Sequence, residues 1–515
     1  MQLRIMLSFL SLFVFAQNAM AYDIDKTIEK YFAPFSDAFS ALMFTPISIF
    51  GIKIPFLLMV IILTSIFCTF YLRGIGIWGF KHGIKQIFHK NEDENHHGEV
   101  SPIGALATAL SGTIGLGNIA GVAIAISIGG PGAMFWMCLG AIFGMALKFC
   151  EVTLALKYRQ VNPDGTISGG PMFYMQQALA KKGLGKFGKI SAIIYAIAFI
   201  PGTLGGGCML QINQATQQFI NITGGENSFF YHHSWVFGFV IAFIVALVIV
   251  GGIKSIARVT SKVVPVMCII YICACLVVII MNFTHIPHAI ATIFREAFFP
   301  QSIYGGIAGS IIIGLRRSIQ SNEAGIGSSP IAYAAVKTNE PVSQGFVSMI
   351  EPFLDTVVVC SMTAFVIILT GEYLHYTNGI TGVELTSGAF ASALPFFPYI
   401  LAIVIIMFAL STLLSWAYYG QKAYTFLVGE GRKRIHAYQF AFCMFIIIGA
   451  CMSIKSVIDF TDANYLFMGA LNLITIFILI KDIKLDLIDY CKRHGLKFAM
   501  NRVWFKDEQP ITENA

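Results

Sequence analysis

The sequence predicts an all-helical protein that crosses a membrane about eleven times. Apolar residues make up 56% of its 515 residues and charged residues only 12%, whereas soluble globular proteins carry about 25% charged residues. Apolar stretches that approach the roughly 20 residues of a membrane span recur along the chain. With the N-terminus placed outside, 27 of the 34 Lys and Arg residues fall on the cytoplasmic side and 5 on the outer side. This bias is the one expected for a multi-pass membrane protein.

The N-terminus resembles a secretory signal peptide over residues 1–21. Arg4 supplies the positive charge, an apolar stretch follows from Ile5 to Ala16, and Ala19-Met20-Ala21 forms a cleavage site. The apolar stretch is too short to span a bilayer, although an uncleaved anchor is the alternative. Cleavage would leave the mature N-terminus outside the cytoplasm.

Eleven apolar stretches follow the predicted signal peptide, and we expect all of them to be helical because none alternates with period two. They cover about 54–72, 102–128, 132–156, 190–218, 236–253, 263–283, 303–315, 345–370, 396–418, 438–453 and 463–480. We expect residues 22–53 to be extracytoplasmic, 54–72 to be an extra helix, and 481–515 to be a cytoplasmic tail.

Two of the spans are interrupted by glycine. The span 102–128 contains Gly112, Gly115 and Gly117, and the span 303–315 is short, glycine-rich and stops at Arg316-Arg317. Without the extra helix, these spans are the first and sixth of ten. Each therefore opens a group of five, over 101–283 and 303–480. Glycine-broken spans in matching positions predict an inverted five-plus-five repeat with a transport site; close helix packing is the alternative explanation.

The first broken span carries the densest candidate site, from Ser111 to Gly121. Glycine disfavours helix by about 1 kcal/mol relative to alanine, so we expect the helix to unwind near Leu116. Backbone groups freed inside a membrane are costly unless they find partners. Freed carbonyls and the hydroxyls of Ser111 or Thr113 suit Na⁺, and freed N–H groups suit a carboxylate.

Four sequence blocks resemble the alanine/glycine:cation symporter family, also called the sodium:alanine symporter family. They are residues 101–159 (beginning SPIGALATALSGTIGLGNIAG), SGGPMFY at 168–174, SNEAGIGSSPIA at 321–332 and SWAYYG at 415–420. The resemblance implies a fold similar to the leucine transporter, with one extra N-terminal helix. It also implies symport of alanine or glycine with Na⁺.

The resemblance assigns candidate substrate contacts to three places in the chain. Gly115, Leu116, Gly117 and Asn118 match the unwound motif of the first helix, with Leu116 replacing the usual Thr or Val. Gln211 and Asn213 match a Gln-x-Asn motif on the third core helix. Trp416 matches an aromatic residue that would bound a small pocket and exclude larger side chains.

The resemblance also assigns a sodium site between the first and eighth core helices. Its ligands would be the carbonyls of Ser111, Ile114 and Phe408 with the side chains of Ser411 and Thr412. Asn118 is a further candidate contact for a second Na⁺.

Several charged residues lie in or beside spans. We expect Lys148 to pair with Glu151, three positions along the same helix, and Glu323 to cap a turn or to pair with Arg316 or Arg317. Glu351 departs from the family pattern. It is either solvated near the cytoplasmic end or a functional intramembrane carboxylate. Asp355 has a structural or a coupling role.

These observations favour a secondary transporter in the inner membrane of a bacterium. It would import a small neutral amino acid, alanine or glycine, with Na⁺ as the coupling ion and no other cofactor. Serine as substrate or H⁺ as coupling ion is the alternative. An intramembrane enzyme is less favoured because the sequence has no HExxH, GxSxG or Walker A motif. A channel is less favoured because paired broken helices are typical of alternating access.

Overall fold

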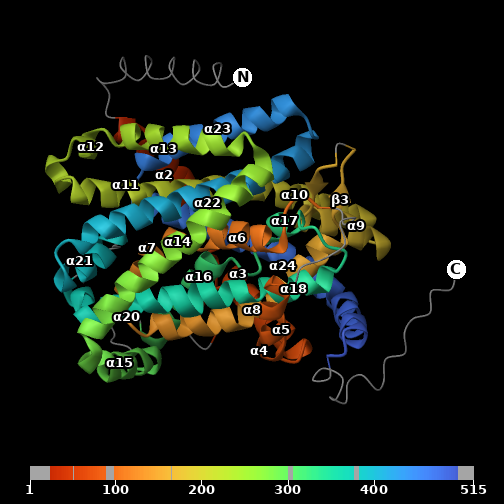
Figure 1. Ribbon diagram of the computed structural model, residues 1–515, viewed down its shortest axis with the longest axis horizontal. Helices are drawn as coiled ribbons and strands as arrows, with labels where there is room; N and C mark the ends of the chain where they lie inside the picture. The colour runs from red at the N-terminus through yellow and green to blue at the C-terminus, as the bar shows by residue number, and fades with distance from the viewer. Residues whose placement is uncertain are drawn as a thin grey trace.

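A computed structural model describes residues 24–49, 52–88, 98–163, 165–299, 306–375 and 382–496. The predicted signal peptide lies outside these residues. Helices dominate the described part of the chain (Figure 1). Its four short strands form two antiparallel pairs: β1 (Pro46–Ile49) with β2 (Ile52–Pro55), and β3 (Gln160–Val161) with β4 (Ile167–Ser168).

A first group of helices covers the region predicted as the first repeat. It runs through α6 (Pro102–Thr113), η1 (Leu116–Asn118), α7 (Ala120–Gly129), α8 (Ala133–Lys157), α10 (Gly185–Leu204), η2 (Gly205–Met209), α11 (Leu210–Ile222), α13 (Ser234–Ile249) and α14 (Gly252–Met281). The group opens on a broken helix, as predicted, because α6 and the η1–α7 segment meet at a bend of 54°.

A second group repeats this order. It runs through α16 (Gly306–Asn322), α17 (Pro330–Tyr333), α18 (Pro341–Ser348), α19 (Ile350–Pro352), η6 (Phe353–Cys360), α20 (Ser361–Thr370), α22 (Phe397–Val428), α23 (Arg432–Ala450) and α24 (Ile454–Arg493). It also opens on a helix that stops inside the molecule, since residues 323–329 separate α16 from α17.

The remaining helices flank or connect these two groups. They are α2 (Ile24–Met43), α3 (Phe56–Tyr71), α4 (Ile75–Trp78), α5 (Phe80–Ile87), α9 (Pro171–Lys181), η3 (Gly225–Asn227), α12 (Phe229–His232), η4 (Phe283–His285), α15 (Ile286–Phe298), η7 (Glu372–His375) and α21 (Val383–Ala393). The helix α3 occupies the position predicted for the extra helix and packs against α8 and α24.

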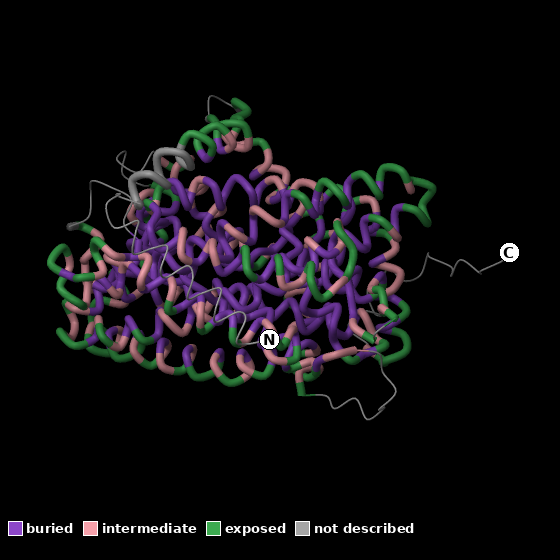
Figure 2. Tube along the Cα trace, turned by 90° about the horizontal axis from the view of Figure 1, so that it is seen from above, coloured by how far each residue is buried: buried purple, intermediate pink, exposed green. Residues whose placement is uncertain are grey.

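The lengths and apolar compositions of the helices fit a membrane. In the described part, six helices are long and apolar enough to cross a bilayer, and the bent pair α6–α7 adds a seventh. Figure 2 shows buried residues through the middle of the molecule and exposed residues along its rim. On α14, Val266, Ile269 and Ile280 are exposed although they are apolar. Such a surface belongs in lipid rather than in water.

One boundary differs from the prediction in a way that matters for the site. The expected span 303–315 ended at Arg316-Arg317, and both arginines were assigned to a cytoplasmic loop. Instead α16 continues to Asn322, so both arginines lie on this helix, with Arg317 buried and Arg316 partly buried. The misreading arose because two adjacent cations normally mark a membrane surface, and their acidic partners lie almost 150 residues further along the chain.

Candidate functional site

The first broken helix has a well-defined structural origin. Ser101 caps α6 by accepting a hydrogen bond from the Gly104 N–H at 3.1 Å, and the helix ends at Thr113. Ile114 has φ −73° and ψ 85°, and Gly115 has φ −132° and ψ −153°, both outside the helical region. The helix predicted to unwind near Leu116 is therefore broken there.

Side chains from other elements satisfy the N–H groups freed at the break. The Gly115 N–H donates to Asn118 Oδ1 at 3.0 Å, and the Leu116 N–H donates to Gln211 Oε1 at 2.9 Å. Gln211 is held in place because its Nε2 donates to the Gly206 carbonyl of η2. A carboxylate would compete for the same two N–H groups, so they form a candidate anion contact.

The carbonyl groups at the break are less completely paired. The Gly112 carbonyl accepts a hydrogen bond from Trp416 Nε1 at 3.2 Å. Among the described residues, the carbonyls of Ser111, Thr113 and Ile114 accept none. Buried carbonyl oxygens without donors are the groups that a hard cation would use.

Part of the predicted sodium set lies together on this side of the break. Ser111 Oγ lies 2.6 Å from the Ser411 carbonyl, and Ser411 Oγ lies 2.9 Å from the Phe408 carbonyl. Thr412 Oγ1 is fully buried and has no hydrogen-bond partner among the residues that the structure describes. A Cβ atom placed on Gly115 would lie 2.6 Å from this hydroxyl, so Thr412 faces the break directly. Oxygen atoms of α6 and α22 therefore lie close together here, and oxygen is the ligand type that a hard cation prefers.

The second broken helix lies against the first. The helix α16 ends where Glu323 adopts φ +57°, a left-handed conformation that is rare for a residue with a side chain. Asn322 stabilises this end because its Oδ1 accepts the Ala324 N–H at 3.0 Å. The position of a Cβ on Gly117 lies 3.7 Å from Ser321 Cα, so the two broken segments are in close proximity.

Asp355, on η6, joins the two breaks. Its Oδ1 accepts a hydrogen bond from Asn118 Nδ2 at 2.7 Å, and its Oδ2 accepts hydrogen bonds from the hydroxyls of Ser321 and Thr356. Asn118 thus reaches both Gly115 and Asp355. From the sequence, Asp355 had two possible roles, and its spatial position could not be inferred.

Two predicted substrate residues occupy different environments. Trp416 is fully buried and stacks between Phe199 and Tyr465, with ring centroids 5.8 and 5.7 Å away. Asn213 does not reach the break, because its Nδ2 donates to the carbonyls of Gly449 and Met452 at the end of α23. Trp416 is therefore a wall beside the break, and Asn213 anchors a neighbouring helix.

Two arginines near the end of α16 form an ion-pair network with α24; Arg317 is buried and Arg316 is partly buried. Arg317 contacts both Gln320 and Asp462 of α24, and Arg316 Nε donates to Asp462 Oδ2 at 2.5 Å. The position of a Cβ on Gly121 lies 3.7 Å from Gln320 Oε1, which places this ion-pair network next to α7. The expected contact of Glu323 with either arginine is absent from the described interactions; Glu323 instead accepts a hydrogen bond from Ser328.

Charged residues on α8 and α19 also pair differently from the prediction. Lys148 Nζ lies 3.0 Å from Glu351 Oε1, and both side chains are fully buried. Glu151 accepts a hydrogen bond from Asn472 instead of pairing with Lys148. The interpretation of Glu351 as a solvated residue near the cytoplasmic end is therefore wrong.

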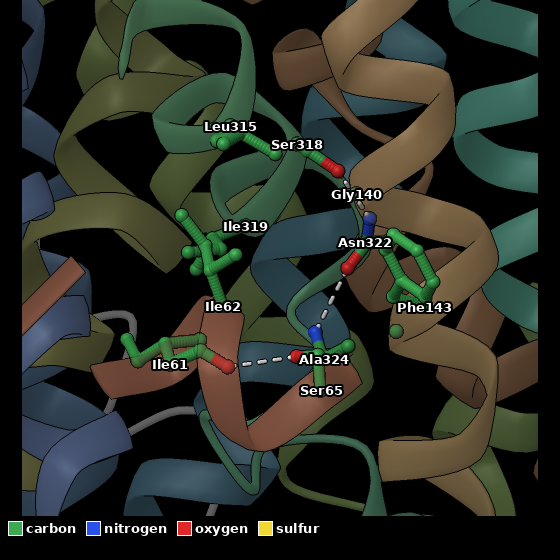
Figure 3. Close-up of a pocket in the computed structure, with 11 residues that line it drawn as sticks. Ile61, Ile62, Ser65, Gly140, Phe143, Leu315, Ser318, Ile319, Asn322 and Ala324 are labelled. Carbon is green, nitrogen blue, oxygen red and sulfur yellow. Dashed lines mark hydrogen bonds between the residues drawn. The ribbon is translucent and has the colours of Figure 1, made fainter. Parts of the chain in front are cut away.

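A separate pocket lies between α3, α8 and α16 (Figure 3). Ile61, Phe143, Leu315 and Ile319 form its apolar walls, and Asn322 borders it. Its free volume is about 20 Å³, room for a water molecule but not for an amino acid. The pocket is therefore distinct from the candidate transport site.

Contacts between distant segments also link the surroundings of the two broken helices. Val100 and Val336 form a parallel β-bridge. The Arg159 guanidinium donates to the carbonyls of Ala334, Val336 and Thr338. These contacts join the start of α6 to the segment after α17, so both broken helices are tied together on this side.

Comparison with known proteins agrees with this arrangement. The sodium:alanine symporter family matches residues 39–502. The sodium/alanine symporter AgcS of Methanococcus maripaludis is 40% identical over 427 residues, covering 82% of this chain and 92% of AgcS. The putative sodium/proton-dependent alanine carrier protein YrbD of Bacillus subtilis is 34% identical over 441 residues, covering 82% and 87%.

A solved structure supports the predicted fold. The crystal structure of MhsT in complex with L-phenylalanine aligns with a TM-score of 0.57 at 14% identity, covering 74% of this chain and 89% of MhsT. The chain therefore has the fold of the leucine transporter, with its paired broken helices. With a family match that spans most of the sequence, this multi-pass membrane protein belongs to the sodium:alanine symporter family.

Proposed function

We propose that this protein imports a small neutral amino acid, alanine or glycine, together with Na⁺. The observation that carries the proposal is the break at Ile114–Leu116. It brings two backbone N–H groups, unpaired carbonyls and the Thr412 hydroxyl into one buried region. A zwitterion and a cation supply the charges that these groups lack.

The contacts support a division of roles. The N–H groups of Gly115 and Leu116 would bind the substrate carboxylate, with Asn118 and Gln211 exchanging their present hydrogen bonds for substrate contacts. The carbonyl of Ile114 and the hydroxyl of Thr412 would bind Na⁺. Trp416 limits the space available to a side chain. No step requires bond making, and a symporter family points to transport rather than catalysis.

Alternating access would break and re-form contacts on the two sides of the breaks. On the outward side, Arg317 and Asp462 link α16 to α24. On the inward side, Arg159 and the Val100–Val336 bridge link segments next to both broken helices. Opening one set of contacts while keeping the other would expose the break to one side of the membrane. We place the protein in a bacterial inner membrane with the N-terminus outside and the C-terminus in the cytoplasm.

Uptake of labelled alanine into proteoliposomes tests this proposal. An inward Na⁺ gradient should drive accumulation, whereas a K⁺ gradient should not. Asn118→Ala removes the hydrogen-bond partner of the Gly115 N–H and one partner of Asp355. Each buried polar group left unpaired costs about 1–3 kcal/mol, so uptake should fall at least about tenfold. The exposed Asn227 provides the control Asn227→Ala, which should transport normally. Uptake that ignores Na⁺ would refute the assigned coupling ion, and normal uptake by folded Asn118→Ala would refute the site.

A further inference from the structure

The short helices α4 and α5 follow α3, which carries exposed apolar side chains. Leu63 and Phe70 of α3 are exposed, as expected of a helix that faces lipid. The helix α3 ends at Tyr71, and Lys484 Nζ of α24 lies 5.2 Å from the centre of the Tyr71 ring. Aromatic and cationic side chains are typical of the level at which a helix leaves the apolar part of a bilayer. The helices α4 and α5 therefore begin at a membrane surface, at the edge of the molecule (Figure 1).

One face of α5 is fixed against α18. Gly83 lies so close to α18 that a Cβ atom placed on it would collide with the Phe346 carbonyl oxygen. On the same face, Gln86 Oε1 accepts a hydrogen bond from Ser343 Oγ at 3.1 Å. These contacts hold α5 in a defined orientation on the helix bundle, so the residues on its opposite face point away from the protein.

The opposite face of α5 is exposed and amphipathic. Its exposed positions are Lys81, Ile84, Lys85 and Phe88, the last of them directly after the helix. At about 100° per residue, these four positions fall within an arc of about 100°. The two apolar side chains occupy one edge of this arc and the two lysines occupy the other. Within the part of the chain that the structure describes, neither lysine forms an ion pair.

This arrangement matches the boundary between the acyl chains and the headgroups of a bilayer. At that boundary the apolar edge of α5 would leave water, and the lysines would extend to the headgroups. Lys81 and Lys85 are four positions apart on one helix, so their charges repel each other. An anionic headgroup offsets this repulsion, whereas a headgroup without net charge does so only weakly. Charge complementarity therefore favours an acidic phospholipid as the partner of this face.

We propose that α5 binds the headgroup of an anionic phospholipid through Lys81 and Lys85, with Ile84 and Phe88 inserted at the start of the acyl region. A lysine near an anionic membrane surface contributes roughly fivefold in affinity. The two lysines together should therefore favour an acidic phospholipid over a neutral one by about tenfold or more. This surface lies outside the candidate transport site, and the inference does not depend on the identity of the transported amino acid or ion.

Quenching of Trp78 fluorescence by brominated lipids tests this inference. Trp78 ends α4, directly before α5, and its emission is isolated by subtracting the emission of the Trp78→Phe variant. The full chain is reconstituted into phosphatidylcholine vesicles in which a minor fraction of the lipid, either phosphatidylglycerol or phosphatidylcholine, carries brominated acyl chains. The wild-type protein should prefer phosphatidylglycerol by about tenfold at this site. Added NaCl should reduce the preference, because salt screens exposed charges.

Two double variants make the result specific. Lys81→Gln combined with Lys85→Gln should lower the preference for phosphatidylglycerol to within about twofold. Lys53→Gln combined with Lys455→Gln removes the same charge from exposed lysines elsewhere and should keep the wild-type preference. Equal quenching of wild-type Trp78 by the two lipids, or an unchanged preference in the Lys81 and Lys85 variant, would overturn the inference. Absence of quenching by either lipid would also overturn it, because α5 would then lie away from the bilayer.

Discussion

Substitution of Gly115 by alanine should disrupt the break at its most crowded point. The added Cβ would lie 2.6 Å from Thr412 Oγ1 and 2.8 Å from Gln211 Oε1, well inside the roughly 3.5 Å of an ordinary non-bonded contact. Overpacking of this kind costs about 1–3 kcal/mol. Displacing Gln211 also leaves the buried Leu116 N–H unpaired, at a further cost of about 1–3 kcal/mol.

The expected consequence is a loss of both stability and transport. A total of about 2–6 kcal/mol corresponds to roughly 30-fold or more in an equilibrium constant, and the displaced groups are the candidate substrate and sodium contacts. Thermal unfolding of the purified protein and labelled alanine uptake in proteoliposomes measure the two effects. The matched control is Gly121→Ala, whose Cβ would lie 3.7 Å from its nearest neighbour. Gly115→Ala protein with the stability and uptake of Gly121→Ala would refute the geometry described here.

Three other substitutions separate binding from stability. Gly117→Ala fits the present structure, with its nearest neighbour 3.7 Å away, so it should unfold as the wild type does but import alanine at least about tenfold more slowly if substrate approaches this backbone. Thr412→Val loses no hydrogen bond, so the variant should keep its thermal stability but require about tenfold more Na⁺ for half-maximal uptake. The control is Thr475→Val, which removes another buried hydroxyl without a partner and should leave the Na⁺ requirement unchanged. Asp462→Asn removes the shared partner of two arginines, a change worth about 3–5 kcal/mol, and should lower the unfolding temperature by several degrees, whereas Asp489→Asn at the exposed pair with Arg493 should not.

The sequence was sufficient to locate the first break because the determinants are local. Gly112, Gly115 and Gly117 lower helix propensity within one span, and Ser111 and Thr113 place polar groups in an apolar stretch. The fold class followed from the same kind of information, namely span length, glycine content and the distribution of positive charge. Each of these is a property of a short segment, so no knowledge of distant contacts was needed.

The ion pairs could not be located in this way because their partners are far apart in the sequence. Arg317 meets Asp462 across 145 residues, and Lys148 meets Glu351 across 203 residues. Local spacing favoured the pair Lys148–Glu151, which has the correct interval on one helix. Tertiary packing brought the Glu351 carboxylate closer, and its contact with Lys148 replaced the local one.

The separation of Gln211 from Asn213 has a simple geometric reason. With 3.6 residues per turn, residues two positions apart on a helix point about 200° away from each other. Gln211 therefore reaches the Leu116 N–H while Asn213 reaches the end of α23 on the opposite side. A motif of the form Gln-x-Asn on a regular helix can present only one of its amides to a given site.

The segment α19–η6–α20 explains how the two broken helices can act together. Glu351 meets Lys148, Asp355 meets both Asn118 and Ser321, and Thr363 donates to the Asn118 carbonyl. These contacts come from one continuous helical stretch, whose π-helical part η6 shifts the register of the residues that follow it. A change at either break must therefore alter hydrogen bonds on the same stretch. Unpaired polar groups are costly inside the bundle, so rearranging one break without the other is unfavourable. This free-energy penalty is the physical basis on which the movements of the amino acid and of Na⁺ would be coupled.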